Sequence, residues 1–255
     1  MNPAAIQRLI ALNQEFYDRF GASFAATRHR LQPGVRRILD GLRGNESVLD
    51  LGCGNGELAR ALSARGFRGR YLGLDFSAVL LRDAERQPLA FRAHFMQAQL
   101  TELVDISKSQ NSALAAVLPA SSFDAVYAFA VLHHVPSLEL RIGLARAVRS
   151  LLKPDGSFTL SNWQYLNSRK LAARVQPWAS AGLHDSDVDE GDHLLDWRGG
   201  GTGLRYVHHF SEAELGRLAE LSGFQVRQTF YSDGMGGRLG LYQVWTKAVE
   251  EPAAP

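Results

Sequence analysis

The segment 47–58 constrains the fold of this chain more than any other stretch. A short apolar run ends in three glycines at alternate positions, Gly52, Gly54 and Gly56, and a helical pattern of apolar residues follows at once. This order predicts a strand, a tight turn and the start of a helix, an arrangement that brings backbone N–H groups close to a ligand. The spacing departs from the G-x-G-x-x-G fingerprint of dinucleotide folds, because Glu57 stands where its third glycine would be.

The acid before the turn favours a cationic ligand. Asp50 would repel a pyrophosphate, but it would attract a ligand with an ammonium and a sulfonium group. S-adenosylmethionine is such a ligand. The segment resembles the cofactor motif of class I S-adenosylmethionine-dependent methyltransferases. This resemblance implies that the turn lines the cofactor site, with Cys53 as a small packing residue rather than a nucleophile.

Strand and helix patterns alternate beyond the glycine turn. They predict an α/β fold with a doubly wound, mostly parallel sheet of seven strands, as in Rossmann-like methyltransferases. The expected strands are Val48–Leu51, Arg70–Leu74, Ala93–Ala98, Phe123–Phe129, Ser157–Ser161, Gln225–Tyr231 and Leu241–Thr246. The expected crossover helices are Glu57–Ala64, Ala78–Gln87 and Leu138–Leu152. A glycine-rich connection joins the last two strands, which suggests an antiparallel hairpin at the sheet edge.

The chain divides into three parts. Residues 1–45 are expected to form an N-terminal helical cap, 46–250 the methyltransferase domain, and 251–255 a tail. From about 162 to 204 the strand–helix rhythm is lost, and a long insertion of this kind in a compact domain is usually functional. The rhythm resumes with an expected strand at Arg205–Phe210.

Asp75 follows the second expected strand, 19 positions after Gly56. A spacing near ~20 residues is the one at which an acid meets a ribose in nucleotide folds. Asp75 could instead cap the next helix, but Ser77 can do so itself, and we therefore favour ribose binding. The resemblance places Phe76 against the adenine and Ser77 in the same loop of the cofactor site.

The resemblance also assigns the end of the third strand to the adenine. Gln99 occupies the position where these enzymes often place an aspartate, and its carbonyl could still accept a bond from the adenine amino group. Leu100 would form an apolar wall.

The loop after the fourth expected strand contains two adjacent histidines. Open α/β sheets bind ligands outside the carboxyl ends of their strands, so Ala130, Val131, His133 and His134 are expected to face the site. A lone histidine is more often structural, but two in this loop favour at least one site histidine.

Segments outside the cofactor core resemble one subgroup, the methyltransferases that esterify a carboxymethyl group on the wobble uridine of tRNA. The similar stretches are 13–20, 24–29, 191–197 and 204–211. This resemblance implies that Tyr17 contacts the cofactor. It also suggests four residues for holding a carboxylate: Arg28, Arg205, His208 and His209. Alternatively, 205–210 is an ordinary strand with its polar side in water.

An ionised carboxylate needs no general base for methylation, but it must be held in position. Arginine can do this with two parallel hydrogen bonds to the carboxylate oxygens. For tRNA as partner the sequence offers five arginines within 16 residues (Arg28, Arg30, Arg36, Arg37 and Arg43) and three tryptophans for base stacking (Trp163, Trp178 and Trp197). These could equally be a solvated helix face and core residues. The subgroup's eukaryotic members use a small zinc-binding activator subunit, which makes such a partner possible here.

Two alternatives remain open. One is a methyltransferase for a small molecule, acting on a carboxylate or as an O- or N-methyltransferase with 162–203 as a lid. The other is a non-catalytic S-adenosylmethionine-binding subunit or sensor.

Composition limits the cellular location and the partners that we expect for this protein. The net charge of +2 is too mild to indicate nucleic-acid binding by itself. No apolar run approaches the ~20 residues that span a bilayer, and no signal peptide is apparent. One cysteine excludes an internal disulfide, and no ligand spacing suggests a metal site. We expect a cytoplasmic protein without a membrane partner, a monomer or weak oligomer.

Overall fold

The structure is a computed structural model, and it describes residues 1–26, 30–104, 112–199 and 201–248. Its centre is a seven-stranded sheet in the order β3-β2-β1-β4-β5-β10-β9. The strands are β1 (Ser47–Leu51), β2 (Arg70–Asp75), β3 (Ala93–Gln97), β4 (Phe123–Phe129), β5 (Leu152–Trp163), β9 (Phe224–Ser232) and β10 (Gly240–Lys247). Neighbours among β1–β5 run parallel, and β10 is antiparallel to both β5 and β9. The predicted fold class and edge hairpin are confirmed.

Alternate residues of the central strands enter two cores, one on each face of the sheet. Val48 and Tyr127 join the core under α2 (Pro33–Leu39) and α3 (Glu57–Ala64). Their neighbours Leu49 and Val126 join the core under α5 (Ser112–Val117), α6 (Leu138–Leu151) and α8 (Glu212–Leu221). Because both faces are covered, β1 is buried along its whole length, and its three apolar residues Val48, Leu49 and Leu51 all enter the cores. The remaining helix of this layer system is α4 (Ala78–Glu85).

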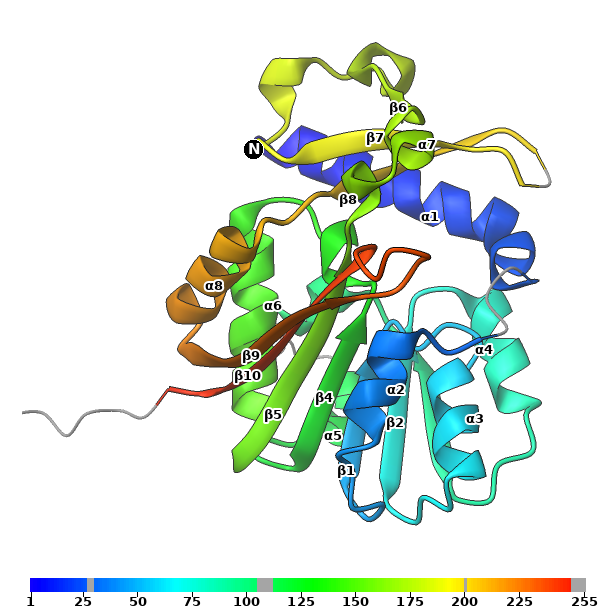
Figure 1. Cartoon of the computed structure of the whole chain (residues 1–255), viewed down its shortest axis with the longest axis vertical. Coiled ribbons are helices and arrows are strands. Elements are labelled where there is room, and N and C mark those ends of the chain that lie inside the picture. The colour runs from blue at the N-terminus through cyan, green and yellow to red at the C-terminus, as the bar shows by residue number, and fades with distance from the viewer. Residues whose placement is uncertain (27–29, 105–111, 200, 249–255) are drawn as a thin grey trace, which may run out of the picture.

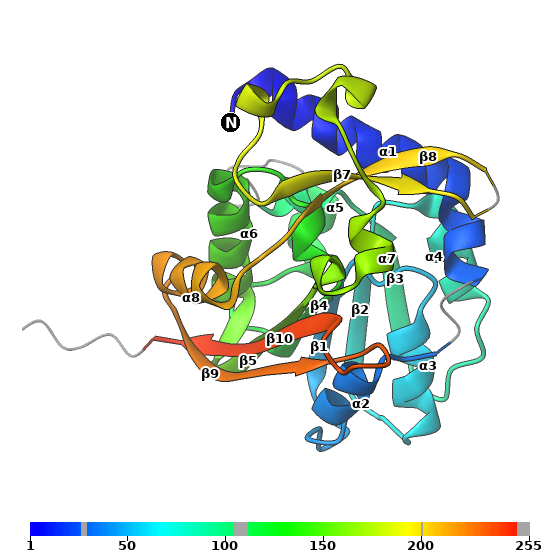
Figure 2. The same cartoon turned by 45° about the horizontal axis from the view of Figure 1, so that its top comes forward.

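A second, smaller sheet lies over one end of the first (Figures 1 and 2). It is antiparallel, in the order β6-β7-β8, with β6 (Val175–Gln176), β7 (Asp192–Trp197) and β8 (Gly203–His208). The long helix α1 (Pro3–Ala26) packs along β8, and the short α7 (Arg169–Ala172) precedes β6. We call α1, α7 and the three strands the cap.

The cap corrects two sequence-based interpretations. The insertion, where the strand–helix rhythm is lost, contributes β6 and β7 to an ordered sheet, and the strand expected at Arg205–Phe210 runs from Gly203 to His208 and pairs with β7. The tryptophans expected to stack on bases are largely core residues: Trp178 packs with α1 in the cap and Trp197 with Phe16 and Phe20, each 8% exposed. Only Trp163 is half-buried at the cavity described next.

Candidate active site

A cavity of about 580 Å³ lies between the cap and the carboxyl ends of β1, β2, β4 and β5. The strand order reverses between β1 and β4, and an open α/β sheet binds its ligand at such a switch point. Fourteen of the predicted site residues line this cavity: Tyr17, Asp50, Gly52, Cys53, Gly54, Asp75, Phe76, Gln99, Leu100, Ala130, Val131, His133, His134 and Arg205. Arg28 lies outside the described residues.

The glycine turn forms one wall of the cavity. Gly52 and Gly54 have φ of +69° and +54°, a region that favours glycine. A Cβ on Gly52 would lie 2.4 Å from Val131, whereas a Cβ on Gly54 would meet no atom within 4 Å. Gly56 corrects the prediction of direct ligand contact, because it begins α3 with φ +78° and is not part of the cavity lining.

Backbone N–H groups from two different loops hold the Asp75 carboxylate in place. One carboxylate oxygen accepts the N–H of Gly54 at 2.9 Å and the other accepts the N–H of Ser77 at 2.8 Å. Burial nevertheless raises the pKa of Asp75 above its ordinary value. Each oxygen keeps acceptor capacity, which suits the two hydroxyls of a ribose.

Ser77 is a correction to the list of ligand contacts. Its side chain accepts the N–H of Leu80 at 3.4 Å and caps α4, and Ser77 does not line the cavity. Its part in the site is indirect, because its backbone orients Asp75. This leaves Asp75 without a capping duty.

We predict that Asp75→Ala weakens binding of S-adenosylmethionine by one to two decades in Kd, because charged hydrogen bonds contribute about 1.5–3 kcal/mol each. Calorimetric titration would measure this, with Asp83→Ala, a half-exposed residue of the following helix α4 that does not line the cavity, as control. An unchanged Kd in folded Asp75→Ala would remove Asp75 from the cofactor site.

Asp50 is a second buried carboxylate in the wall. It is 4% exposed and accepts the hydroxyl of Tyr71 at 2.6 Å. Burial raises its pKa to about 7, against the opposing bond from Tyr71 and with the help of the nearby Asp75 charge. A cation beside this carboxylate would stabilise its ionised form, and the ammonium group of the cofactor is such a cation.

The raised pKa gives a prediction for Asp50→Asn. The folded chain keeps a proton that the unfolded chain loses near pH ~4, so stability falls as pH rises from about 4 to 7. Above that window the asparagine variant should be more stable than the wild type, by up to about 4 kcal/mol, and should bind the cofactor more weakly. Urea unfolding at about pH 5 and pH 8 measures the difference. A stability gap that is the same at both pH values would contradict this account.

The part of the cavity where the adenine was expected has apolar and polar walls. Phe76 lies against the ring of Tyr17, with centroids 5.4 Å apart, and Leu100 is close by in the lining. Gln99 also lines the cavity, but its side chain accepts the backbone N–H of Glu102 in a capping box. This local bond engages the carbonyl oxygen that was expected to accept from the adenine amino group. Burial raises the pKa of Cys53, which supports its role as a packing residue.

The two histidines lie where β4 ends, as predicted. Ala130 takes a left-handed φ of +57° there, and the chain turns into a short 3-10 helix, Leu132–His134. Nδ1 of His134 faces the carbonyl of Tyr206 at 3.0 Å, and its Nε2 faces the hydroxyl of Tyr17 at 3.1 Å. Because a carbonyl can only accept, this geometry assigns the neutral ring's proton to Nδ1 and lets Nε2 accept from Tyr17.

Arg205 reaches the cavity from β8. Its side chain is 3% exposed, and its guanidinium carbon lies 5.5, 4.8 and 5.9 Å from the ring centroids of Phe16, Trp163 and Trp197. Three rings from three different elements therefore fix the plane of the guanidinium. A held, planar cation in a cavity wall can grip a carboxylate.

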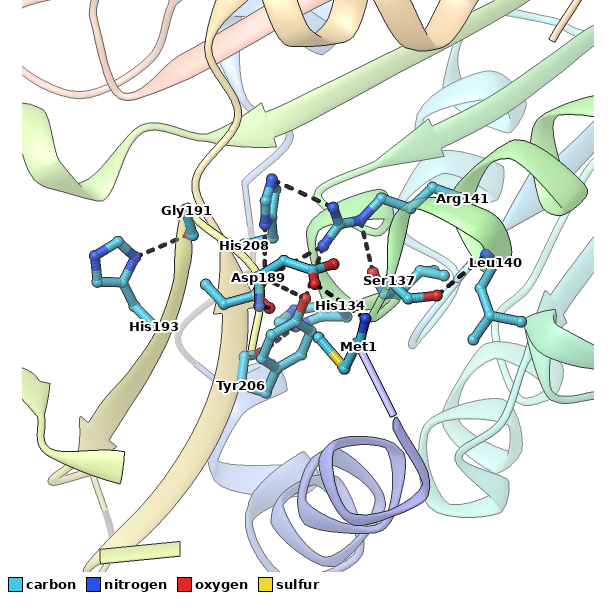
Figure 3. A network of polar contacts seen from close by, with 12 residues as sticks. Met1, His134, Ser137, Leu140, Arg141, Asp189, Gly191, His193, Tyr206 and His208 are labelled. Atoms are coloured by element: carbon cyan, nitrogen blue, oxygen red, sulfur yellow. Dashed lines mark hydrogen bonds and ion pairs between the residues drawn. The ribbon is translucent and has the colours of Figure 1, made fainter. Parts of the chain in front are cut away.

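The predicted roles of His208 and His209 are corrected, because neither lines the cavity. His208 is buried between two acids, with Nδ1 2.6 Å from Asp192 and Nε2 2.7 Å from Glu214. Arg141 also reaches this group, donating to the hydroxyl of Tyr206 at 2.8 Å (Figure 3). We call Arg141, Asp192, Tyr206, His208 and Glu214 the buried polar cluster. It joins α6 and α8 to the cap.

His209 follows the end of β8. Its N–H donates to the carbonyl of Gly191 at 2.7 Å, and its ring meets the edge of Tyr165. Burial lowers the pKa of His209, with the neighbouring His193 and His208 acting in the same direction. His209 thus stabilises the cap.

Two asparagines in the cavity lining were not anticipated. The Asn13 amide pairs with both backbone groups of Tyr206, at 3.2 and 2.8 Å, and fastens α1 to β8. Asn162, at the end of β5, is 1% exposed, and neither polar atom of its side chain has a hydrogen-bond partner. A buried unsatisfied amide is costly and is often found at functional sites. Asn13 opens the stretch 13–20 that resembles the subgroup, whereas nothing in the local sequence around Asn162 marks it.

Comparison with known proteins identifies the family. A family model described as a methyltransferase domain matches residues 23–229, most of the chain. The chain belongs to the methyltransferase-domain family. It is also 30% identical over 213 residues to a protein of Encephalitozoon cuniculi named as a methyltransferase, covering 83% of this chain and 86% of the relative.

Other relatives differ in what they act on. The tRNA (carboxymethyluridine(34)-5-O)-methyltransferase ALKBH8 of Macaca fascicularis is 26% identical over 63% of this chain, which spans only 22% of that protein. A ubiquinone biosynthesis O-methyltransferase of Chromobacterium violaceum is 29% identical over 75% of this chain and 68% of its own length.

Solved structures share the fold. A SAM-dependent methyltransferase from Methanosarcina mazei has a TM-score of 0.64 at 24% identity, covering 86% of this chain and 99% of that one. A complex between the Haloferax volcanii Trm112 methyltransferase activator and its methyltransferase gives 0.64 at 14% identity, covering 94% and 99%.

The protein is an S-adenosylmethionine-dependent methyltransferase. Its own residues fit the cofactor on two counts: the turn at Gly54 leaves open space along the cavity wall, and the buried Asp75 keeps acceptor capacity there. Among the described residues no helix is long and apolar enough to cross a membrane, and no three His, Cys, Asp or Glu side chains gather as metal ligands.

Proposed function

We propose that this methyltransferase esterifies a carboxylate, the carboxymethyl group of a modified wobble uridine in tRNA. The observation that carries the proposal is Arg205, a buried cation stacked among three aromatic rings in the cavity wall. A planar guanidinium held in this way matches a carboxylate bidentately. The resemblance to ALKBH8 supports tRNA as the carrier of that carboxylate.

In this reaction the protein mainly has to position the acceptor carboxylate against the methyl group. When bound, S-adenosylmethionine supplies a methyl group activated by its sulfonium. Arg205 orients the acceptor carboxylate, which is ionised at neutral pH and needs no general base. Helix α1 covers the cavity with Asn13 and Tyr17 and limits the access of water. Orientation of this kind can lower a barrier by about 7–11 kcal/mol.

A small activator subunit is a further part of the proposal. The Haloferax volcanii methyltransferase with this fold is complexed with the Trm112 activator. Purification of the tagged protein from its own cells would test for a stoichiometric small partner, and a fully active protein without one would remove the subunit from the proposal.

The direct test is mass spectrometry of tRNA nucleosides from cells with and without the gene. We expect the methyl ester of 5-carboxymethyluridine to disappear and the free acid to accumulate. Unchanged nucleosides, together with turnover on a small metabolite, would overturn the tRNA proposal.

A second candidate function is methylation of a hydroxyl on a small molecule. The observation that favours it is His134, whose Nδ1 faces a backbone carbonyl and whose Nε2 faces the Tyr17 hydroxyl beside the cavity, so that in the neutral form Nε2 carries the lone pair. A histidine with that tautomer could act as a general base. The ubiquinone biosynthesis O-methyltransferase of Chromobacterium violaceum is a relative of this class.

The pH dependence separates the two candidates. A carboxylate with a pKa of about 4 is ready throughout the neutral range, so we predict a kcat/KM at saturating cofactor that is flat or falling from about pH 6.5 to 9. Saturation keeps the titration of Asp50 in the free protein out of the profile. A steep rise across that window would favour the hydroxyl acceptor and assign His134 as its base.

A further inference from the structure

Four exposed cations surround the mouth of the cavity, and they come from three separate segments. Arg30 precedes α2, Arg169 and Lys170 lie in α7, and Arg238 lies in the connection between β9 and β10. Their chain neighbours Leu31, Leu171 and Leu239 line the cavity itself. We call these four residues the basic rim.

Hydrogen bonds hold the three segments together. The side chain of Asn167 donates to the carbonyl of Arg238 at 2.9 Å, which joins the start of α7 to the β9–β10 connection. Asp233 of the same connection accepts the N–H of Gly34 at 3.0 Å, which joins it to α2. Figures 1 and 2 show the tip of the β9–β10 hairpin between α7, which belongs to the cap, and α2. The rim is therefore one surface.

The rim carries uncompensated positive charge. Within the described part of the chain, none of its four cations forms an ion pair with a carboxylate, whereas Arg174 and Arg198 share Asp196 and Arg217 pairs with Glu220. Two unusually exposed apolar groups stand beside it, Tyr231 at 39% and Met235 at 109%.

We propose that the basic rim binds the sugar–phosphate backbone of an RNA acceptor on both sides of the nucleotide that enters the cavity. An enzyme that modifies a base takes one nucleotide into its pocket, which leaves the flanking phosphates at the mouth. Cations on several sides of the opening suit those phosphates, and Tyr231 offers a ring for a neighbouring base. This inference rests on the proposed function and names the surface by which its substrate docks.

The rim also revises the sequence-based RNA cluster. Arg43 is paired with Glu46 and lines a different hollow, at the amino ends of β4 and β5 with Lys153. Arg37 lies in the same hollow and stacks on Phe230 at 4.2 Å. Of the four arginines in that cluster that the structure describes, Arg30 is the one that lines the cavity.

The test compares two triple variants of equal charge. The rim variant is Arg169→Ala, Lys170→Ala and Arg238→Ala, and the control variant is Arg65→Ala, Arg86→Ala and Arg217→Ala, three ion-paired residues outside the rim. Fluorescence anisotropy with labelled tRNA over about 50–200 mM salt gives the Kd. We expect the rim variant to bind at least about 30-fold more weakly and to flatten the slope of log Kd against log salt by about two, as three lost phosphate contacts require.

A second measurement keeps the two proposals separable. Methylation of the free nucleoside 5-carboxymethyluridine should be equal in wild type and rim variant, since the nucleoside has no flanking phosphates. Equal tRNA binding by the rim and control variants would overturn the rim while leaving the proposed function intact. Rim-dependent tRNA binding without methylation of the nucleoside or of tRNA would support the rim and overturn the proposed function. Loss of binding to vesicles containing phosphatidylserine, with tRNA binding unchanged, would overturn the rim in favour of a membrane surface.

Discussion

Arg205→Lys is expected to reduce kcat/KM for the carboxylate acceptor by about 100-fold or more, while the Kd for S-adenosylmethionine changes less than about twofold. Lysine keeps the charge, but it has neither the plane that stacks among Phe16, Trp163 and Trp197 nor the fork that bonds both carboxylate oxygens. Losing one charged hydrogen bond and the fixed orientation accounts for about 3 kcal/mol. Single-turnover kinetics with separate calorimetry of the cofactor would measure the two effects.

The matched control is Arg217→Lys, an exposed arginine of α8 that pairs with Glu220 and does not line the cavity. It should leave both constants unchanged. Full activity in Arg205→Lys would remove the carboxylate clamp from the proposed function. A parallel loss of cofactor affinity would instead reassign Arg205 to the cofactor.

Asp192→Ala is expected to lower the free energy of unfolding by about 3–5 kcal/mol. The Asp192 carboxylate accepts bonds from Tyr206 at 2.8 Å and from His208 at 2.6 Å, and it faces the fully buried Arg141 at 3.3 Å. Removing it leaves Arg141 buried without this counter-charge. Urea unfolding followed by two spectroscopic probes would measure the loss.

The pH dependence of that loss has a definite sign. Burial by itself would raise the pKa of Asp192, but the bond from His208 and the charge of Arg141 outweigh it and hold the pKa below its ordinary value. The contribution of Asp192 to stability is therefore complete above the unfolded pKa of about 4 and is lost as pH falls through the folded value.

Two controls accompany this prediction. Exposed Arg217→Ala should lower the free energy of unfolding by less than about 1 kcal/mol. The double variant Arg141→Met with Asp192→Leu should recover part of the loss, and a variant Asp192→Ala as stable as the wild type would contradict a structural role for the cluster.

Local patterns were enough to bring most of the predicted cofactor residues to one cavity. The glycine turn, Asp50 and Asp75 lie within a few residues of strand ends that their own apolar runs define, so their relation to the sheet follows from chain order alone. The same holds for His133 and His134, which come directly after β4. In each case, knowing where a strand ends is enough to place the side chain near the ligand.

The acceptor half required contacts between distant parts of the chain. The amide of Asn13 pairs with Tyr206 across 193 positions, and His134 reaches the same carbonyl across 72. On β8, Arg205 turns toward the cavity while the next residue, Tyr206, turns toward the buried polar cluster. Side chains alternate along a strand, so the assignment of each residue depends on the register of β8 against β7. The motif that contains Arg205, His208 and His209 does not distinguish them.

The amino-acid sequence by itself therefore determined the fold, the cofactor and the position of the glycine turn. These depend on short-range hydrophobic periodicity and on glycine's access to positive φ. Only the tertiary structure decided which of the described candidate residues line the cavity, Arg205 and His134 but not His208 and His209, and that the inserted segment forms an ordered sheet. Those outcomes depend on which faces of α1, β7 and β8 become buried, and such burial is an interaction between elements that no single stretch of sequence contains.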